Sequence, residues 1–326
     1  MPTVLEPAVI SMVKRVGVAH ALTRYQVDDA LEDSFLELAA VLDFPLADVR
    51  TLVDRTLEWY HYKRNDYPEG VDRALSDLVI HVTQPFRIPF MTERMNWVVR
   101  ELASVPRATT LLDYGGGGGK DSILFARLGW QTTYADLFGL LTPYVKRRFE
   151  VRGLNVAMVD VRDLGERRFD AINCMDVIEH IYDVEHAVAD IFAHLWDGGH
   201  LLVFPCFHNS WDGDHVEKNC GYRPYFRQML DRIGLQFVSR LGEGPLGEVY
   251  HFVRRRPGMG SVSEERALVR SELYFLSEQF SLESALRAIP AIGADLNEEA
   301  VSTVIDNLAI RRLSRHRLVE LGYRNA

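Results

Sequence analysis

Apolar runs and helical patterns alternate along the middle of the chain. Runs typical of buried strands lie at 109–114, 130–136, 155–161, 169–177, 199–207, 234–241 and 247–256. Amphipathic patterns typical of helices lie between most of them, at 120–129, 141–153, 186–199 and 223–234. This alternation predicts an α/β fold with a doubly wound, mostly parallel seven-stranded sheet covered by helices on both faces. Only a short linker separates the last two runs, so we expect a hairpin at the sheet edge.

The regions on either side of this core have apolar residues at helical spacing. In the first, Pro89 interrupts the pattern before a helix that leads into the core. In the last, helical patterns cover 263–280, 281–289 and 296–321. We therefore predict a helical N-terminal region at 1–108 that forms a lid on the substrate side, and a core at 109–256. A helical C-terminal segment at 257–326 would serve as a lid or an oligomerisation surface, with a homodimer formed through the terminal helices.

Composition narrows the class of protein. The 326 residues are 47% hydrophobic and 25% charged, which are ordinary values for a globular protein. The net charge of -9 argues against general binding to nucleic-acid backbone or to an anionic membrane. The three cysteines include no C-x-x-C pair and cannot build a disulfide framework. We see no signal peptide or membrane-spanning run, and expect a cytoplasmic location.

A run of five glycines follows the first predicted strand and opens the first core helix. Such a loop permits tight turns and close approach of the backbone to a ligand, at a helix start that presents N–H groups. In doubly wound sheets, ligands bind beyond the carboxyl ends of the strands. The position predicts a nucleotide-like ligand rather than a flexible linker. Dinucleotide-binding folds use similar turns, so the loop alone does not identify the ligand.

Acidic residues end the next two strands. Asp136 ends the second run, where a carboxylate can accept the two hydroxyls of a ribose, and Asp160 lies near the end of the third. With the segments LLDYGGGGGKDS, YADLF, VDV, FDAINCMDVIEHI and DGGHLLVFPCF, the chain resembles the class I S-adenosylmethionine-dependent methyltransferases. The fourth-strand segment is close to the form in ubiquinone-type O-methyltransferases. The resemblance covers 109–256, whereas both terminal regions match nothing we can place.

The resemblance implies a binding site for S-adenosyl-L-methionine as cosubstrate. Asp113 would receive its amino group, Asp136 its ribose, and the pair Asp160 and Val161 its adenine. Cys174 and Met175 would line the methionine end, and Arg87 could reach the carboxylate. The full set of predicted cosubstrate-binding residues is Asp113, Tyr114, Gly115, Gly117, Gly119, Asp136, Leu137, Asp160, Val161, Cys174, Met175 and Arg87.

The segment after the fifth strand concentrates polar side chains on the ligand side of the sheet. His215 has a suitable intrinsic pKa for a general base, His208 is a second candidate, and Asp214 or Asp212 could orient the imidazole. The same D-G-D-H pattern could hold Mg²⁺, but the matching family motif is absent, so we predict no metal. Alternatively, these side chains form a polar surface loop.

We predict methyl transfer by in-line displacement to a hydroxyl or amine of a small molecule, which could be tethered to a carrier. Acidic charge and the absence of an Asn-Pro-Pro-Tyr motif argue against a nucleic-acid acceptor. A second hypothesis keeps the cosubstrate but attacks its aminocarboxypropyl carbon, as in azetidine-2-carboxylate cyclisation, and releases methylthioadenosine. A third is a non-catalytic protein that binds the cosubstrate or a partner. A dehydrogenase fits the fourth-strand segment less well.

Overall fold

The computed structural model describes residues 31–42, 45–51, 89–105, 109–139, 141–207, 215–244, 247–258 and 260–292. The chain divides into two compact units. The first contains residues 1–175 and 199–203, and the second contains residues 176–198 and 204–326. None of the helices in the described ranges is long and apolar enough to cross a membrane.

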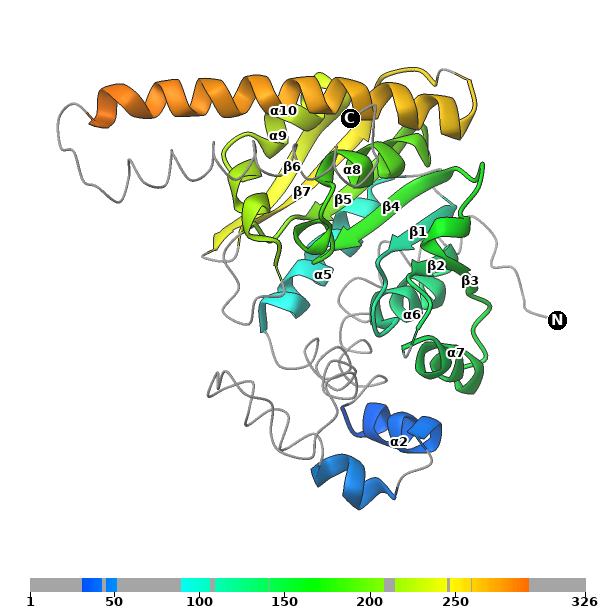
Figure 1. Ribbon diagram of the computed structural model, residues 1–326. Coiled ribbons are helices and arrows are strands. Elements are labelled where there is room, and N and C mark those ends of the chain that lie inside the picture. The colour runs from blue at the N-terminus through cyan, green and yellow to red at the C-terminus, as the bar shows by residue number, and fades with distance from the viewer. Residues whose placement is uncertain are drawn as a thin grey trace. The chain divides into compact units, whose positions relative to one another are not determined.

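Seven strands form one sheet in the order β3-β2-β1-β4-β5-β7-β6 (Figure 1). Their bounds are β1 Thr110–Tyr114, β2 Gln131–Asp136, β3 Ala157–Asp160, β4 Phe169–Met175, β5 Leu195–Phe204, β6 Leu235–Gly244 and β7 Gly247–Arg254. Strand β1 pairs in parallel with β2 and β4, and β2 pairs in parallel with β3. Strands β6 and β7 form an antiparallel hairpin. The predicted doubly wound sheet with an edge hairpin is confirmed.

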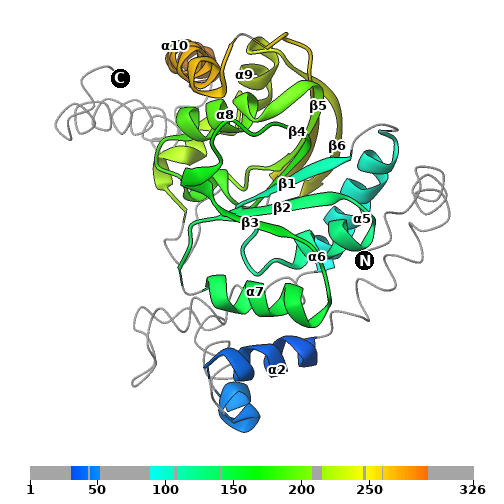
Figure 2. The same cartoon turned by 90° about the vertical axis from the view of Figure 1, so that its right-hand side faces the viewer.

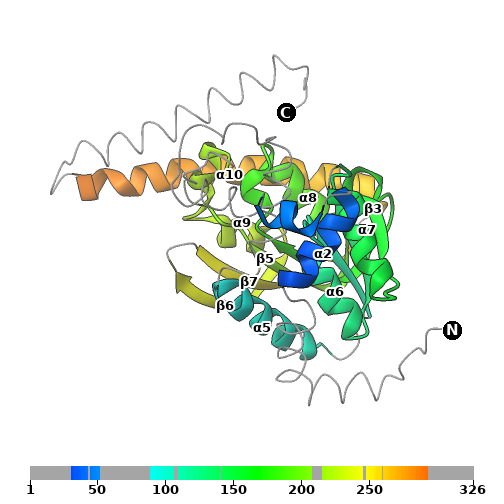
Figure 3. The ribbon, with the colours of Figure 1, turned by 90° about the horizontal axis from the view of Figure 1, so that it is seen from below.

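In the first unit, helices α6 (Lys120–Arg127) and α7 (Leu141–Val151) lie on the same face of strands β1 to β3 (Figure 2). Helix α2 (Leu31–Leu42) packs against α7 on the side away from these strands (Figures 2 and 3). One apolar cluster joins these elements: Leu38, Ala39, Val49, Ile123, Tyr134, Tyr144, Val145 and Phe149. The described part of the N-terminal region is therefore packed onto the core of this unit.

Helix α5 (Pro89–Ala103) leads into β1. We expected Pro89 to interrupt the helical pattern, whereas the helix begins at this residue. The first helical position suits proline, because its missing N–H would have no partner within the helix.

In the second unit, helix α10 (Val262–Ile292) lies along α8 (Val184–Ala193) and α9 (Phe226–Arg232), as Figure 1 shows. The sequence pattern suggested separate helices that meet near Ser281, but α10 is one continuous helix. No glycine or proline interrupts its sequence before Pro290, so nothing in the backbone ends it earlier. Ser261 and Glu264 begin it with reciprocal hydrogen bonds between side chain and backbone, in a capping box.

One further boundary differs from expectation. Strand β5 begins at Leu195, inside the segment we expected to be the end of a helix and a glycine turn, and Gly198 within it has a positive φ of 78°. A 3₁₀ turn, Ile178–His180, precedes helix α8. Asp183 caps α8 by accepting the His186 N–H at 2.8 Å.

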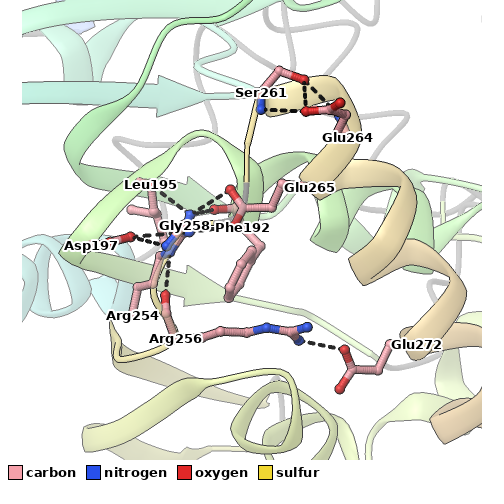
Figure 4. A network of polar contacts seen from close by, with 10 residues as sticks. All are labelled: Phe192, Leu195, Asp197, Arg254, Arg256, Gly258, Ser261, Glu264, Glu265 and Glu272. Atoms are coloured by element: carbon pink, nitrogen blue, oxygen red, sulfur yellow. Dashed lines mark hydrogen bonds and ion pairs between the residues drawn. The ribbon is translucent and has the colours of Figure 1, made fainter.

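A fully buried arginine ties the second unit together (Figure 4). Arg254, the last residue of β7, forms an ion pair with Glu265 of α10 at 2.5 Å. Its guanidinium also donates to the carbonyls of Phe192 (3.0 Å), in the last turn of α8, and Leu195 (2.8 Å). One side chain thus holds β7, α8, β5 and α10.

Candidate active site

The glycine loop follows β1 in a conformation that requires glycine. Gly115, Gly117 and Gly119 have φ values of 70°, 49° and 72°. A side chain at Gly119 would also place its Cβ atom 2.8 Å from Val145 of α7. At Gly116, the Cβ atom would lie 2.5 Å from the ring of Tyr134. The loop is therefore packed tightly against its neighbours at Gly116 and Gly119, whereas a Cβ atom at Gly117 would meet no atom within 4 Å.

Most N–H groups of this loop donate within the protein. Those of Gly115 and Gly116 both donate to the carbonyl of Ala135 in β2, at 2.8 and 3.2 Å, and that of Gly119 donates to the Gly116 carbonyl at 2.9 Å. The Tyr134 hydroxyl donates to the Gly117 carbonyl at 2.9 Å. These bonds fix the course of the loop over the end of β2.

Asp136 ends β2 and is oriented by the glycine loop. Its Oδ2 atom accepts the Gly117 N–H at 2.7 Å, and its Oδ1 atom accepts the Leu137 N–H at 2.7 Å. A carboxylate has about four acceptor positions, so a diol can share oxygens that these N–H groups already orient. The Leu137 side chain is exposed.

The side chain of Asp113 lies in the protein interior, on the side of the glycine loop away from solvent. The carboxylate is buried and accepts hydrogen bonds from Ser122 Oγ at 2.6 Å and Asn173 Nδ2 at 2.9 Å. Burial raises the pKa of Asp113 to about 7, and the charge of Asp121 adds to this effect. In this structure, Asp113 links the end of β1 to α6 and β4. Its neighbour Tyr114, the last residue of β1, is also buried.

Asp160 ends β3 and pairs in register with Asp136 of β2. Arg162 donates three hydrogen bonds to its carboxylate, at 2.6, 2.7 and 3.0 Å, and the Phe138 N–H donates a fourth at 3.1 Å. These hydrogen bonds, with those from Arg162 first, hold the pKa of Asp160 well below its usual range. Because about four acceptor positions are used, Asp160 is poorly suited to accept another donor. Val161 begins the 3₁₀ turn that follows.

The last residues of β4 complete the predicted cosubstrate set. Cys174 and Met175 are buried. Asp176 comes next, with a left-handed φ of 55°, which is uncommon for a residue other than glycine. Sequence patterns did not indicate this conformation. All predicted cosubstrate residues lie in the first unit at the ends of β1 to β4, except Arg87, which lies outside the described residues.

The predicted base lies in a cluster within the second unit. Ligand atoms of Glu179, Cys206 and His215 lie within 4.8 Å of one another, and the rings of His180 and His215 meet edge to face at 4.9 Å. Asn219 supports this arrangement by donating to the carbonyls of residues 178, 179 and 181 at 2.8 to 3.3 Å. His208, Asp212 and Asp214 lie outside the described residues, so their predicted roles stay predictions.

Sequence analysis missed Glu179 as a neighbour of His215. We assigned an orienting role only to the aspartates close to His215 in sequence. The Val216 N–H donates to the Glu179 carbonyl at 2.9 Å, a contact between residues far apart along the chain. Carboxylate, thiolate and imidazole are also ligands that Zn²⁺ accepts, so this cluster could hold a metal. The prediction that no metal binds remains a prediction.

Comparison with known proteins shows which family part of the chain matches. Residues 88–239 match the family model described as a methyltransferase domain. An enzyme called ubiquinone biosynthesis O-methyltransferase from Xanthomonas axonopodis pv. citri is 30% identical over 129 residues, which is 38% of this chain and 50% of that protein. Its namesake from Xylella fastidiosa is 31% identical over 142 residues, or 42% and 52% of the two chains. The chain thus spans about half the length of these curated relatives.

Among solved structures, the N-methyltransferase NodS from Bradyrhizobium japonicum, in complex with S-adenosylhomocysteine, is 18% identical. Its TM-score is 0.43, over 53% of this chain and 91% of that one. The match to the family model confirms the predicted methyltransferase domain for residues 88–239, which is just under half of the chain.

Proposed function

We propose that this protein transfers a methyl group from S-adenosylmethionine to a hydroxyl or amine of a small molecule, free or tethered to a carrier. The observation that carries the proposal is the contact between the glycine loop and Asp136. The Gly117 N–H orients the carboxylate at the end of β2. A carboxylate fixed there, beside left-handed glycines, suits a ribose diol.

The cosubstrate roles of the predicted residues can be refined from their surroundings. Asp136 binds the ribose. Gly115 and Gly117 already donate their N–H groups within the protein, so they contribute packing and carbonyl groups. Asp113 joins β1, which precedes the glycine loop, to α6, which follows it, and to β4. Asp160 orients the backbone of Phe138 and Arg162, which leaves backbone groups after β3 to contact the adenine.

S-adenosylmethionine supplies an electrophilic methyl group on a sulfonium. A lone pair of the acceptor forms the new bond to the methyl carbon, while the carbon–sulfur electrons return to sulfur and S-adenosylhomocysteine leaves. A hydroxyl acceptor must also lose its proton, and we assign that proton to His215. Glu179, whose ligand atom lies within 4.8 Å of that of His215, would stabilise the imidazolium that forms. The protein's remaining task is to align the acceptor and exclude water.

The same cluster favours a second version of this reaction. Glu179, Cys206 and His215 would then hold a divalent metal, whose Lewis acidity would lower the pKa of an acceptor hydroxyl far enough for water to take its proton. Chelation separates the two versions. If His215 is the base, a chelator leaves the rate unchanged. If the cluster holds a metal, chelation lowers the rate and added Zn²⁺ restores it.

The first experiment identifies the nucleoside product by mass, with S-adenosylmethionine alone and then with small hydroxyl and amine compounds. We expect intact cosubstrate in the first case and S-adenosylhomocysteine in the second. Methylthioadenosine would overturn methyl transfer in favour of attack at the aminocarboxypropyl carbon.

The role of His215 is tested by His215→Ala. For a hydroxyl acceptor this change should lower kcat by about 100-fold or more, with unchanged cosubstrate affinity. His186→Ala, at an exposed position of α8, is the matched control. Equal activity in the two variants would remove His215 from the mechanism.

A further inference from the structure

A buried arginine of α7 contacts the glycine loop. Arg148 is 1% exposed, and its Nη1 atom donates to the carbonyl of Gly118. The preceding carbonyl, that of Gly117, accepts from Tyr134 of β2. Two side chains therefore hold consecutive peptide groups of the loop from two different elements. The Gly118 carbonyl belongs to the same peptide group as the Gly119 N–H, which donates to Gly116, so this peptide is held at both ends.

The partner of Arg148 comes from the N-terminal region. Glu37 of α2 is 9% exposed and accepts the Nε–H of Arg148 on Oε2 at 3.0 Å. The other oxygen of Glu37 forms an ion pair with Arg152, in the turn directly after α7. Residue 37 lies well before residue 88, where the match to the methyltransferase family begins. A part of the chain outside the family match therefore orients the side chain that holds the loop.

Apolar packing follows the same route as these polar contacts. Leu38 of α2 and Val49 are fully buried in one cluster with Val145 and Phe149 of α7. A Cβ atom at Gly119 would lie 2.8 Å from Val145 and 3.3 Å from Phe149, which shows how closely α7 approaches the loop. Because α7 contacts the glycine loop closely, we expect a change in how α2 packs on α7 to shift the loop as well.

We propose that Arg148, held by Glu37, is a positioning residue for the cosubstrate loop, and that the N-terminal helix α2 thereby sets the affinity for S-adenosylmethionine. This inference rests on the proposed function, because it assumes that the loop binds this cosubstrate. Arg148 keeps the Gly118 peptide in the orientation that lets Gly117 hold Asp136. Without that support, the loop must be ordered when the ligand binds, and part of the binding free energy is lost.

The test compares two arginines that share Glu37 but differ in their contact with the loop. Arg148→Met removes the hydrogen bonds to Gly118 and Glu37. Arg152→Met removes an ion pair to Glu37 and a hydrogen bond to the Arg148 carbonyl, but leaves the bond to Gly118 in place. Both changes remove a largely buried charge and should lower the free energy of unfolding. Affinity for S-adenosylmethionine is measured by calorimetry on the purified folded full-length chain, with the competent fraction taken from the stoichiometry.

We expect Arg148→Met to raise Kd by about tenfold, and Arg152→Met to change it by less than about twofold. With a known acceptor, KM for the cosubstrate should rise while kcat at saturation stays within about twofold. Arg148→Lys should restore part of the affinity, because an ammonium can still donate to the carbonyl.

Glu37→Gln covers the case in which Arg148→Met does not fold. This change keeps the shape of the side chain but replaces the ion pair with Arg148 by a weaker neutral hydrogen bond. It should raise the Kd for S-adenosylmethionine by about threefold. Wild-type Kd in both Glu37→Gln and whichever Arg148 variant folds would overturn the inference. An equal rise in Arg148→Met and Arg152→Met would do the same, because it would indicate a general loss of packing. Absence of binding by the wild-type chain would instead overturn the proposed function.

Discussion

The two compact units each contain a fully buried arginine that pairs with a glutamate from a different secondary-structure element. Arg148 pairs with Glu37 of α2, and Arg254 pairs with Glu265 of α10. Both guanidiniums also donate to backbone carbonyls. Arg254 donates hydrogen bonds to the carbonyls of residues 192 and 195, at the end of α8 and the start of β5. The carbonyl to which Arg148 donates belongs to Gly118 of the glycine loop.

The comparison teaches that the same chemistry has different consequences according to the backbone it supports. A guanidinium that caps the end of a helix joins structural elements, so its loss should appear as lost stability. A guanidinium that holds a ligand-binding loop should affect ligand affinity in addition to stability. The residue types and their burial do not distinguish the two cases; the identity of the acceptor does.

The largest effect expected is on the stability of the second unit. Arg254→Met leaves Glu265 buried without its main counter-charge and should lower the free energy of unfolding by about 3–5 kcal/mol. Denaturant titration measures this loss. The S-adenosylmethionine affinity of the folded fraction should stay at the wild-type value. A tenfold loss of affinity here would break the comparison, because Arg254 would then act on the cosubstrate site as well.

The next largest expected effect is on cosubstrate affinity, and it tests whether Asp136, beside the glycine loop of the first unit, binds the ribose. Asp136→Ala removes a charged acceptor for two hydroxyls and should weaken cosubstrate binding by about 100-fold. The matched control is Asp170→Ala, at the start of β4, where the carboxylate accepts N–H and hydroxyl groups of Thr109 and Thr110 at 2.9 to 3.2 Å. That control should lose stability but keep its affinity. Equal affinity in the two variants would exclude Asp136 as the ribose ligand.

The smallest expected effect is a pH dependence of the free energy of unfolding, caused by the buried carboxyl group of Asp113. Among the described residues, Asp113 accepts hydrogen bonds from two neutral side chains, those of Ser122 and Asn173. Because its pKa is raised to about 7 from 3.8, the folded chain holds a proton that the unfolded chain releases. The free energy of unfolding should therefore fall as the pH rises from about 4 to 7, by about 1–2 kcal/mol.

Urea midpoints at pH 5.5 and 7.5 measure this slope. In Asp113→Asn the fall should be smaller, because the substituted side chain does not ionise. An identical slope in both proteins would show that other groups cause the pH dependence.

The sheet could be predicted because its strands are short apolar runs separated by amphipathic helices. The alternation also placed Asp136 and Asp160 at strand ends, where the structure has them. Helix α10 was divided incorrectly near Ser281, because a serine that resembles a cap does not end a helix when the backbone can continue. The start of β5 was missed because two glycines after Asp197 suggested a turn, although Gly198 is accommodated within the strand.

The polar contacts of the site could be predicted only in part. Arg148 follows Tyr144 and Val145 at helical spacing, so its place on the apolar face of α7 could be read from the sequence. Its partner Glu37 could not, because the pairing depends on how α2 packs on α7. Glu179 beside His215 is another such contact between residues distant in the chain.

The most direct test of the account is a calorimetric titration of the full chain with S-adenosylmethionine, beside Asp136→Ala and Asp170→Ala. The account predicts one site per chain in the wild type, binding about 100-fold weaker in Asp136→Ala, and wild-type affinity in Asp170→Ala. A wild-type chain that binds no S-adenosylmethionine, or an Asp136→Ala variant that binds it as tightly as the wild type does, would contradict it.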